Sequence, residues 1–339
     1  MLCHEAIATE FMCQLLEESG FHVSSGLTVY SDAAAFLASL HHLADSGNKI
    51  VVYEVLDPLE ASDDSYWVHR EILAFISNKG NLDKLVPQAF LPARSLVGRQ
   101  DLLRGNIQLP VVIKVASDEP SNGGLGVRVC RSPSDIIAMC DRFFPCDSFV
   151  VEELIHVEKN YGLSFAVPRT GPIVYLGGSE QIIEDHVNYA GTWIEDSTRV
   201  SSGIAEGALE AMSRAQTLGF YGFAGADVLV STDGRVLVVD LNFRLTTATP
   251  PRLFADSILS STGRTVLRPE RFVASATGDT AARFVRQLRR ERRFVPRYIL
   301  PRFDGRSGSM VHGFLLGHSR AEIEKLRTFM FTTLCGPSE

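Results

Sequence analysis

Three oxygen-bearing side chains lie close together in the stretch 222–246. Asp227 lies within one apolar run, and Asp240 and Asn242 stand two residues apart at the end of the next. Because side chains along a strand alternate between its faces, Asp240 and Asn242 point to the same side. Carboxylate and amide oxygens are hard ligands that suit Mg²⁺ or Mn²⁺. The stretch therefore predicts a divalent-cation site, although short Asp/Asn patterns also mark ordinary strand ends.

Arg244 follows Asn242 by two residues and adds a fixed cation for phosphate or carboxylate. The two apolar runs, 226–230 and 236–239, are separated by Ser-Thr-Asp-Gly. A linker of that length containing glycine predicts a β-hairpin. The hairpin would bring the carboxylates, the amide and the arginine together.

Lysine is scarce, since only six of the 33 basic residues are lysines, so a lysine inside an apolar strand needs its own explanation. Lys114 is such a residue, in the run 109–116, and Gly123, Gly124 and Gly126 follow it. Glycines let backbone N–H groups approach a ligand closely, which is a common way to hold phosphate. The combination predicts a phosphate site. The alternative is a glycine-rich hairpin whose lysine reaches out to water.

The first third of the chain must supply a scaffold for these groups. Apolar spacing predicts helices over 5–19, ending at Gly20, and over 32–44. The run 49–55 predicts a buried strand, and a third amphipathic helix leads through Ile76 to Asn78-Lys79. This alternation indicates an α/β domain with parallel strands.

The middle of the chain alternates strands and helices in the order helix 132–143, strand 148–155, strands 163–167 and 172–176, and helix 205–218. Ser132-Pro133 begins the first of these helices with a serine cap and a proline in the first turn. The stretch 179–193 is polar and without a clear period, which predicts an irregular loop over a site.

A basic helix is predicted over 281–293. It carries Arg283, Arg286, Arg289, Arg290, Arg292 and Arg293. This face is either simply solvated or docks an acidic partner such as a carrier protein. A strand over 308–316 contains His312, which is more often a structural strand histidine than a catalytic one, and a closing helix covers 320–330.

Composition excludes several classes of protein. A length of 339 residues allows two or three domains, and a net charge of -7 with a pI near 5.8 argues against a general nucleic-acid-binding surface. The six cysteines form no CxxC pair, and neither a signal peptide nor an apolar run of membrane-spanning length is present. We therefore expect a cytoplasmic protein with reduced thiols and no membrane partner.

The order of these motifs resembles the ATP-grasp superfamily over residues 76–249. The motifs are Asn78-Lys79, the strand with Lys114, the glycine loop, a strand ending in Glu152-Glu153-Leu154-Ile155, a polar loop, and the group Asp227, Asp240-Leu-Asn242 and Arg244. No single motif decides the matter, but their common order is specific. Within the superfamily, the chain is most similar to the carboxylate-amine ligases that join amino acids or peptides in natural-product biosynthesis.

The resemblance implies an ATP-grasp fold of the α/β (α+β) class, made of four parts. An N-terminal α/β domain would cover 1–77 and a small lid and nucleotide-binding subdomain 78–154. A larger metal-binding core subdomain would cover 155–268, followed by a C-terminal extension over 269–339.

The resemblance also implies ATP and Mg²⁺ (or Mn²⁺) as cofactors and gives roles to individual residues. Lys79 and Lys114 are similar to the lysines that reach the α- and β-phosphates, and the glycine loop to the one that folds over them. The hinge segment, Glu152, Glu153, Leu154 and Ile155, would read adenine through its backbone and an acidic side chain. Glu158 or Asn160 would hold the ribose. Asp227, Asp240 and Asn242 are similar to metal ligands, and Arg244 to a phosphate or acyl-phosphate clamp.

Three departures from the family pattern stand out. Asp240 replaces a glutamate, which shortens its reach, and Phe243 replaces a proline, which is expected to loosen the local backbone. No lysine lies between Lys159 and Lys325. The charge that a loop lysine gives to the γ-phosphate would therefore come from Arg199 or Arg244.

The predicted function is an ATP-dependent carboxylate-amine ligase. A carboxylic acid would form an acyl phosphate, an amine such as an amino acid or peptide would attack it, and ADP and phosphate would leave. One alternative is capture of the acyl phosphate by a carrier-protein thiol, and another is a nucleotide-binding protein without turnover. The identity of the substrates and the oligomeric state stay open, a homodimer being one option.

Overall fold

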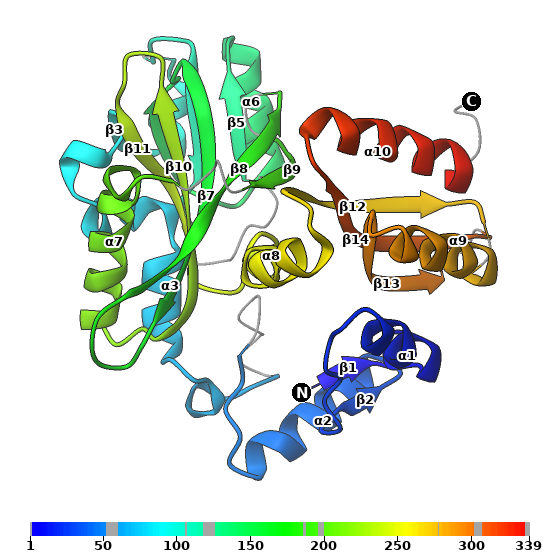
Figure 1. Cartoon of the computed structure of the whole chain (residues 1–339). Helices are drawn as coiled ribbons and strands as arrows, with labels where there is room; N and C mark the ends of the chain where they lie inside the picture. Colours follow the sequence, from blue (N-terminus) through cyan, green and yellow to red (C-terminus); the bar gives the residue numbers. More distant parts are fainter. Residues whose placement is uncertain are drawn as a thin grey trace.

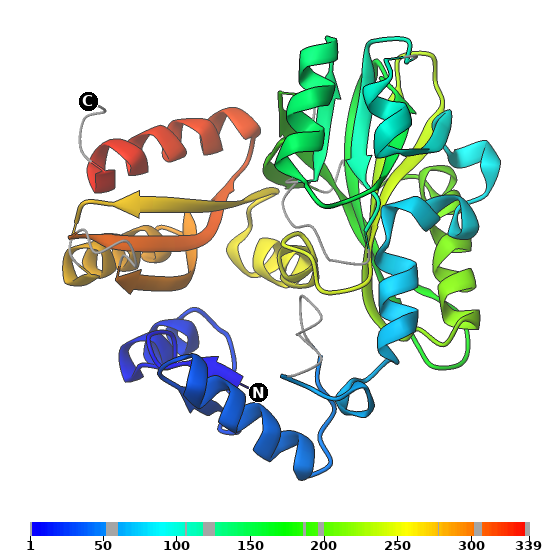
Figure 2. The same cartoon turned by 180° about the vertical axis from the view of Figure 1, so that it is seen from behind.

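The chain folds into three parts that surround a central helix, as the computed structural model shows (Figure 1). The structure describes residues 2–51, 60–105, 107–117, 126–185, 188–195, 200–276, 278–301 and 307–335. Seen from behind in Figure 2, the N-terminal part (blue) lies below the C-terminal strands (orange), and the yellow helix α8 (Thr249–Thr262) lies between these strands and the green strands of the core. The predicted ATP-grasp fold of the mixed α/β class is confirmed by structural relatives reported below.

The N-terminal part is a small α/β unit. Strands β1 (Leu2–His4) and β2 (Thr28–Tyr30) pair in parallel, as predicted, and helices α1 (Glu10–Glu18) and α2 (Ala33–Asp45) accompany them. Helix α2 begins where the sequence predicts, because the Asp32 carboxylate accepts the backbone N–H of Ala35. Of the predicted strand 49–55, Ile50 forms a bridge to Tyr66, while residues 52–55 lie outside the described residues.

A connecting segment leads from this unit to the first large sheet. It contains the one-turn helices η1 (Asp63–Ser65), η2 (Lys79–Asn81) and η3 (Gln88–Phe90), with α3 (Arg70–Ser77) and α4 (Leu82–Leu85) between them. Helix α3 ends at Asn78, whose side chain accepts the N–H of Gly80 and so begins η2. Lys79 therefore stands at a fixed bend of the chain.

A four-stranded antiparallel sheet forms the lid. Its strands are β3 (Arg94–Gly98), β6 (Ser148–Glu153), β4 (Val111–Val115) and β5 (Val127–Cys130), in that spatial order. Helices α5 (Arg99–Leu103) and α6 (Pro133–Arg142) cover one face over an apolar core that includes Ile113 and Phe149. Ser132 and Asp135 form a complete capping box at the start of α6.

An eight-stranded antiparallel sheet forms the core and continues into the C-terminal extension. In spatial order its strands are β11 (Val236–Asn242), β10 (Gly222–Ser231), β7 (Val157–Val167), β8 (Val174–Glu184), β9 (Asn188–Glu195), β12 (Val266–Ala274), β14 (Ser309–Gly317) and β13 (Phe294–Pro301). Helix α7 (Ser202–Thr217) packs an alanine-rich face on β7, β10 and β11. Helix α8 (Thr249–Thr262) packs on β8 and β12.

The prediction of an irregular loop over 179–193 was wrong, because strands β8 and β9 occupy most of it. Their polar side chains have partners far along the chain: the guanidinium of Arg320 donates to Glu180 at 2.8 and 2.9 Å and to Glu195 at 2.8 Å, and it lies over the Trp193 ring. The polarity of this stretch reflects ion pairing within the protein. Sequence periodicity does not reveal such partners.

The C-terminal extension and the N-terminal helix share one hydrophobic core. Helices α9 (Gly278–Arg290) and α10 (Arg320–Cys335) pack on β13, β12 and β14, and Met12 and Leu15 of α1 complete the core. The backbone N–H of Ile299 also lies 3.2 Å from the Met12 sulfur. Arg286 and Arg289 of the basic face lie 3.3 and 3.8 Å from the Glu18 carboxylate. Part of that face therefore binds the protein's own first helix.

Two further predictions concern single residue types. All six cysteines are free. His312 lies on β14 and stacks on Tyr298 of β13, so it is a structural strand histidine.

Within the described ranges, none of the helices combines the length and the apolar character needed to cross a membrane.

Candidate active site

A cavity of about 800 Å³ lies between the lid sheet and the core sheet, and it gathers most of the predicted site residues. Those that line it are Lys79, Lys114, Glu152, Glu153, Leu154, Ile155, Asn160, Asp227, Asp240, Asn242 and Arg244. They come from η2, from the lid strands and the residues just after β6, from β7, and from the hairpin of β10 and β11 with the segment that follows it. The structure thus brings together groups that are up to 165 positions apart in the sequence, from residue 79 to residue 244.

The hairpin forms the floor of this cavity. Asp227 and Asp240 are directly paired across β10 and β11, and Asn242 pairs with Gly225. Paired residues on adjacent antiparallel strands project to the same face, as do residues two apart on one strand. The two carboxylates and the amide therefore share the face that lines the cavity, as the sequence predicts.

Gln181 supports the floor of the cavity from strand β8, two strands away from β10. Its side-chain amide donates a 2.8 Å hydrogen bond to Asp227 Oδ1. Gly162 on β7, the strand between them, makes the contact feasible, because a Cβ there would lie 2.9 Å from the Gln181 amide nitrogen. Because Gly162 has no side chain, the Gln181 amide can reach Asp227 across β7.

The electrostatics of the floor favour a bound cation. Burial, and then the charge of Asp240, raise the pKa of Asp227 to about 6. Burial also opposes the charged form of Asp240, but the ammonium groups of Lys79 and Lys114 outweigh it and hold the pKa of Asp240 below its ordinary value. Two facing half-buried carboxylates repel each other, and a divalent cation would remove that repulsion.

The donor set fits Mg²⁺ or Mn²⁺. Two carboxylates and one amide oxygen on one face are hard ligands, and Mg²⁺ usually completes its shell with water and substrate phosphate. Within the part of the chain that the structure describes, no cluster of three or more His, Cys, Asp or Glu side chains forms. A site built from two acids and an amide is consistent with that result.

The two lysines stand above this floor, each held by an acid. The Lys79 ammonium lies 2.8 Å from Asp240 Oδ1. The Lys114 ammonium lies 2.6 Å from Glu152 Oε2 and donates a 2.7 Å hydrogen bond to the Val239 carbonyl. Lys114 is 6% exposed and Glu152 is 3% exposed, so the lysine does not reach out to water. The snorkelling alternative for Lys114 is therefore wrong.

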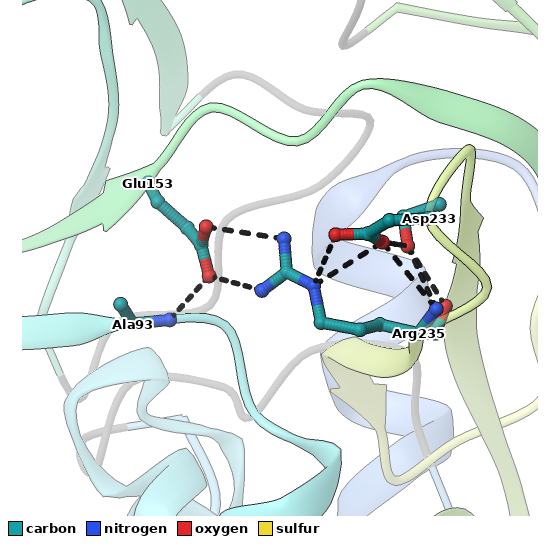
Figure 3. A network of polar contacts seen from close by, with 5 residues as sticks. Ala93, Glu153, Asp233 and Arg235 are labelled. Carbon is teal, nitrogen blue, oxygen red and sulfur yellow. Dashed lines mark hydrogen bonds and ion pairs between the residues drawn. The ribbon is translucent and has the colours of Figure 1, made fainter.

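The second glutamate of the hinge faces away from the lysines. Figure 3 shows Glu153 held by both arms of Arg235, at 2.8 and 3.3 Å, while the backbone N–H of Ala93 donates to the same carboxylate. The hydrogen bonds from Arg235 lower the pKa of Glu153. Arg235 lies in the turn between β10 and β11, so this network ties the lid to the hairpin that carries the metal ligands. Adenine recognition by Glu153 stays a prediction.

Apolar side chains line the end of the cavity near the hinge. They are Val112, Val127, Leu154, Ile155, Leu229 and Val239. Such a surface suits the faces of a purine ring. Of the two ribose candidates, Asn160 lines the cavity, whereas Glu158 is exposed on β7 and is not among the lining residues.

Arg244 also lines the cavity, together with residues 245–248 that lead into α8, and its charge acts on Asp240. Among the described residues it takes part in no ion pair, unlike Lys79 and Lys114. The expectation that Phe243 loosens this segment was wrong. Phe243 is 4% exposed and packs edge-on against Phe220 at 4.9 Å, which anchors the chain between Asn242 and Arg244.

Some predicted positions cannot be placed. Gly123, Gly124 and Arg199 lie outside the described residues. Gly126 is buried just before β5, and its carbonyl accepts the backbone N–H of Val115.

Sequence reasoning missed three residues that complete the site. Gln181 supports Asp227, Arg94 lies beside Glu152, and Tyr189 of β9 lines the cavity. Gln181 and Tyr189 were hidden in the stretch predicted to be a loop, where polar and apolar residues do not alternate. Arg94 gave no signal, because its partner lies 58 positions away.

Comparisons with known proteins agree with this geometry. Two family models match the chain: one described as the ATP-grasp part of L-aspartate–L-methionine ligase, over residues 92–242, and one described as the N-terminal domain of the same ligase, over residues 1–74. Together they account for the N-terminal unit, the lid sheet, and the core sheet as far as Asn242.

Solved structures with low sequence identity share the fold. N5-carboxyaminoimidazole synthase from Aspergillus clavatus, in complex with ADP and 5-aminoimidazole ribonucleotide, has a TM-score of 0.60 at 14% identity, over 94% of this chain and 95% of that chain. Biotin carboxylase from Campylobacter jejuni has a TM-score of 0.59 at 12% identity, over 98% of this chain and 85% of that chain. The chain belongs to the L-aspartate–L-methionine ligase family of ATP-grasp proteins and is an amino-acid ligase that joins a carboxylate to an amine.

Proposed function

We propose that this protein uses ATP to join L-aspartate and L-methionine through an amide bond, with an acyl phosphate as intermediate. The two family models supply the substrate pair. The observation that carries the proposal is the single cavity in which two lysines, two facing carboxylates, an amide and Arg244 meet. Cations and cation ligands are what phosphoryl transfer requires, and no nucleophilic side chain is needed.

ATP would lie with its base against the apolar hinge end and its phosphates toward the hairpin. Lys79 and Lys114 are the cations nearest the floor, held by Asp240 and Glu152. Their ammonium groups would bind the phosphates as point charges. Asn160, on the wall beyond the hinge, is the better placed of the two ribose candidates.

Asp227, Asp240 and Asn242 would hold the divalent cation. When bound, such an ion neutralises phosphate charge and keeps the transferred group in line. Gln181 would keep Asp227 turned toward the ion through its hydrogen bond. Lys79 contacts Asp240, so its ammonium group would lie close to both the ion and the phosphates.

The reaction would take place at the Arg244 end of the cavity. A carboxylate oxygen of one amino acid attacks the γ-phosphorus, the bond to the β-phosphate oxygen breaks, and ADP forms. The neutral amine of the second amino acid then attacks the acyl carbon, phosphate leaves and the amine loses a proton. Arg244 has no ion-pair partner among the described residues, so it is available to bind the carboxylate and then the acyl phosphate.

Phosphate release with both amino acids present tests this proposal. We expect ADP and phosphate to form only with ATP, Mg²⁺, L-aspartate and L-methionine together, and mass spectrometry to show one dipeptide per ADP. Asn242→Ala should abolish turnover, while Asn188→Ala, on β9 outside the cavity lining, serves as a matched control. Turnover that needs only one of the two amino acids, or that yields no dipeptide, would contradict the proposal.

A further inference from the structure

Within the described part of the chain, Arg94 is the one arginine that contacts both the backbone of Lys79 and the carboxylate that holds Lys114. Its guanidinium donates a 2.5 Å hydrogen bond to the backbone carbonyl of Lys79. It also lies 3.6 Å from Glu152, whose other oxygen is 2.6 Å from the Lys114 ammonium. Arg94 does not line the cavity itself. It can therefore affect a bound nucleotide only through these neighbours.

The strand register fixes this arrangement. Arg94 on β3 pairs directly with Glu152 on β6, and Glu152 pairs with Val112 on β4. The side chains of Arg94 and Glu152 therefore project from the same face of the lid sheet. η2, which carries Lys79, packs against β6 and β4. The guanidinium thus bridges the edge of the lid and the bend at Lys79.

Arg94 and Lys114 lie beside the same buried carboxylate. The side chains of Arg94, Lys114 and Glu152 are 8%, 7% and 3% exposed, so the two cations share this buried anion. Burial lowers the pKa of Arg94, which shows that desolvation opposes its charge. Asp83 also acts on Arg94, and Asp240 on Lys114, so further acids help to balance the cluster. Because Glu152 is shared, it does not neutralise Lys114 alone, and the ammonium group can still bind the phosphates of the proposed nucleotide.

We propose that Arg94 is a positioning residue that sets the two lysines for phosphate binding. It holds Lys79 by its backbone, and it shares Glu152 with Lys114, so that this carboxylate does not neutralise Lys114 alone. The inference rests on the nucleotide orientation of the proposed function. It assigns a role to a residue that contacts neither ATP nor the amino acids.

A lysine at position 94 would not replace the arginine. The planar guanidinium donates one nitrogen to the Lys79 carbonyl and places another 3.6 Å from the Glu152 carboxylate. An ammonium group is a single point charge and can keep only one of them at good geometry. Arg94→Lys therefore keeps the charge of the cluster and removes the bridge.

Binding of ADP and of adenosine, measured by titration calorimetry with Mg²⁺, separates positioning from folding. The lysines act on phosphates and not on the base, so Arg94→Lys and Arg94→Met should weaken ADP binding at least 10-fold and leave adenosine binding within two-fold. Arg99→Lys is the matched control. Arg99 is a partly buried lid arginine, 3.9 Å from Asp141, and it lies outside the cavity lining. Circular dichroism and thermal melting confirm that each variant is folded.

Each outcome decides between explanations. ADP affinity at the wild-type level in folded Arg94→Lys would overturn the inference. An equal loss of ADP and adenosine binding would also overturn it, since Arg94 would then only support the fold of the lid. If the wild-type protein binds ADP no better than adenosine, the phosphate site itself is misplaced, and the proposed function fails before the Arg94 variants are considered.

Discussion

Replacing Asp227 by asparagine should stabilise the metal-free protein and abolish its activity. The substitution removes one of two facing carboxylates and keeps the shape of the side chain. The hydrogen bond from Gln181 can also remain, because it ends on Oδ1, which asparagine retains. What changes is the negative charge that burial and Asp240 both oppose.

The size of the effect follows from the pKa of Asp227. It is raised from 3.8 to about 6, so the folded state binds this proton more tightly than the unfolded chain. The charged carboxylate therefore lowers folding stability as pH rises from 3.8 to 6, and the loss persists above pH 6. At about 1.4 kcal/mol for each pKa unit, the loss is at most about 3 kcal/mol. The two carboxylates titrate together, so we expect a gain of about 1–3 kcal/mol in Asp227→Asn at pH 7.5.

Urea unfolding at two pH values, with EDTA or with Mg²⁺ and ADP, measures this effect. In EDTA at pH 7.5 the variant should be more stable than the wild type, and the difference should shrink at pH 4.5, where wild-type Asp227 is protonated. Mg²⁺ with ADP should stabilise the wild type much more than the variant, which should form no ADP from ATP. A variant that is less stable at pH 7.5 in EDTA, or a difference independent of pH, would refute the repulsion between the two carboxylates.

Three further substitutions test other parts of the structure. Gly162→Ala places a Cβ 2.9 Å from the Gln181 amide nitrogen, so the Mg²⁺ concentration for half-maximal activity should rise about 10-fold while metal-free adenosine binding is unchanged. His312 has its pKa lowered to about 4, chiefly by burial, so its neutral form stabilises the fold above pH 6.5 and that contribution falls as pH drops toward 4. When the pH falls from 7 to 4.5, the free energy of unfolding in urea should therefore decrease by about 2–3 kcal/mol less for His312→Phe than for the wild type. Arg235→Gln breaks the double contact with Glu153, and we expect the KM for ATP to rise several-fold with stability changed by less than about 1 kcal/mol, because both side chains are partly exposed. An unchanged KM would show that the network does not hold the hinge.

Local patterns were sufficient for the hairpin that carries Asp227, Asp240 and Asn242. The Ser-Thr-Asp-Gly turn and two β-branched runs predict the hairpin, and the pairing of Asp227 with Asp240 follows from the short connection. The cap at Ser132 and the strand around Lys114 depend equally on neighbours in the sequence. Such features are set within about ten residues, which is the range that sequence periodicity describes.

Features that depend on distant partners were not predictable. Glu180 and Glu195 lie in strands because Arg320 neutralises them, and Arg320 stands 140 and 125 positions further on. Phe243 looked like a weak substitute for proline until Phe220 was found against it. In each case a side chain that is unremarkable in the sequence gains its role from a contact that only the three-dimensional fold creates.

The core shared by α1 and the C-terminal extension has a consequence for synthesis of the protein. Met12 and Leu15 leave the ribosome early, but Val285, Ile299 and the other extension residues that bury them are translated much later. The apolar face of α1 must therefore wait until the C-terminal extension has been translated. A ribosome that stalls before β13 would present an exposed helix to chaperones and proteases.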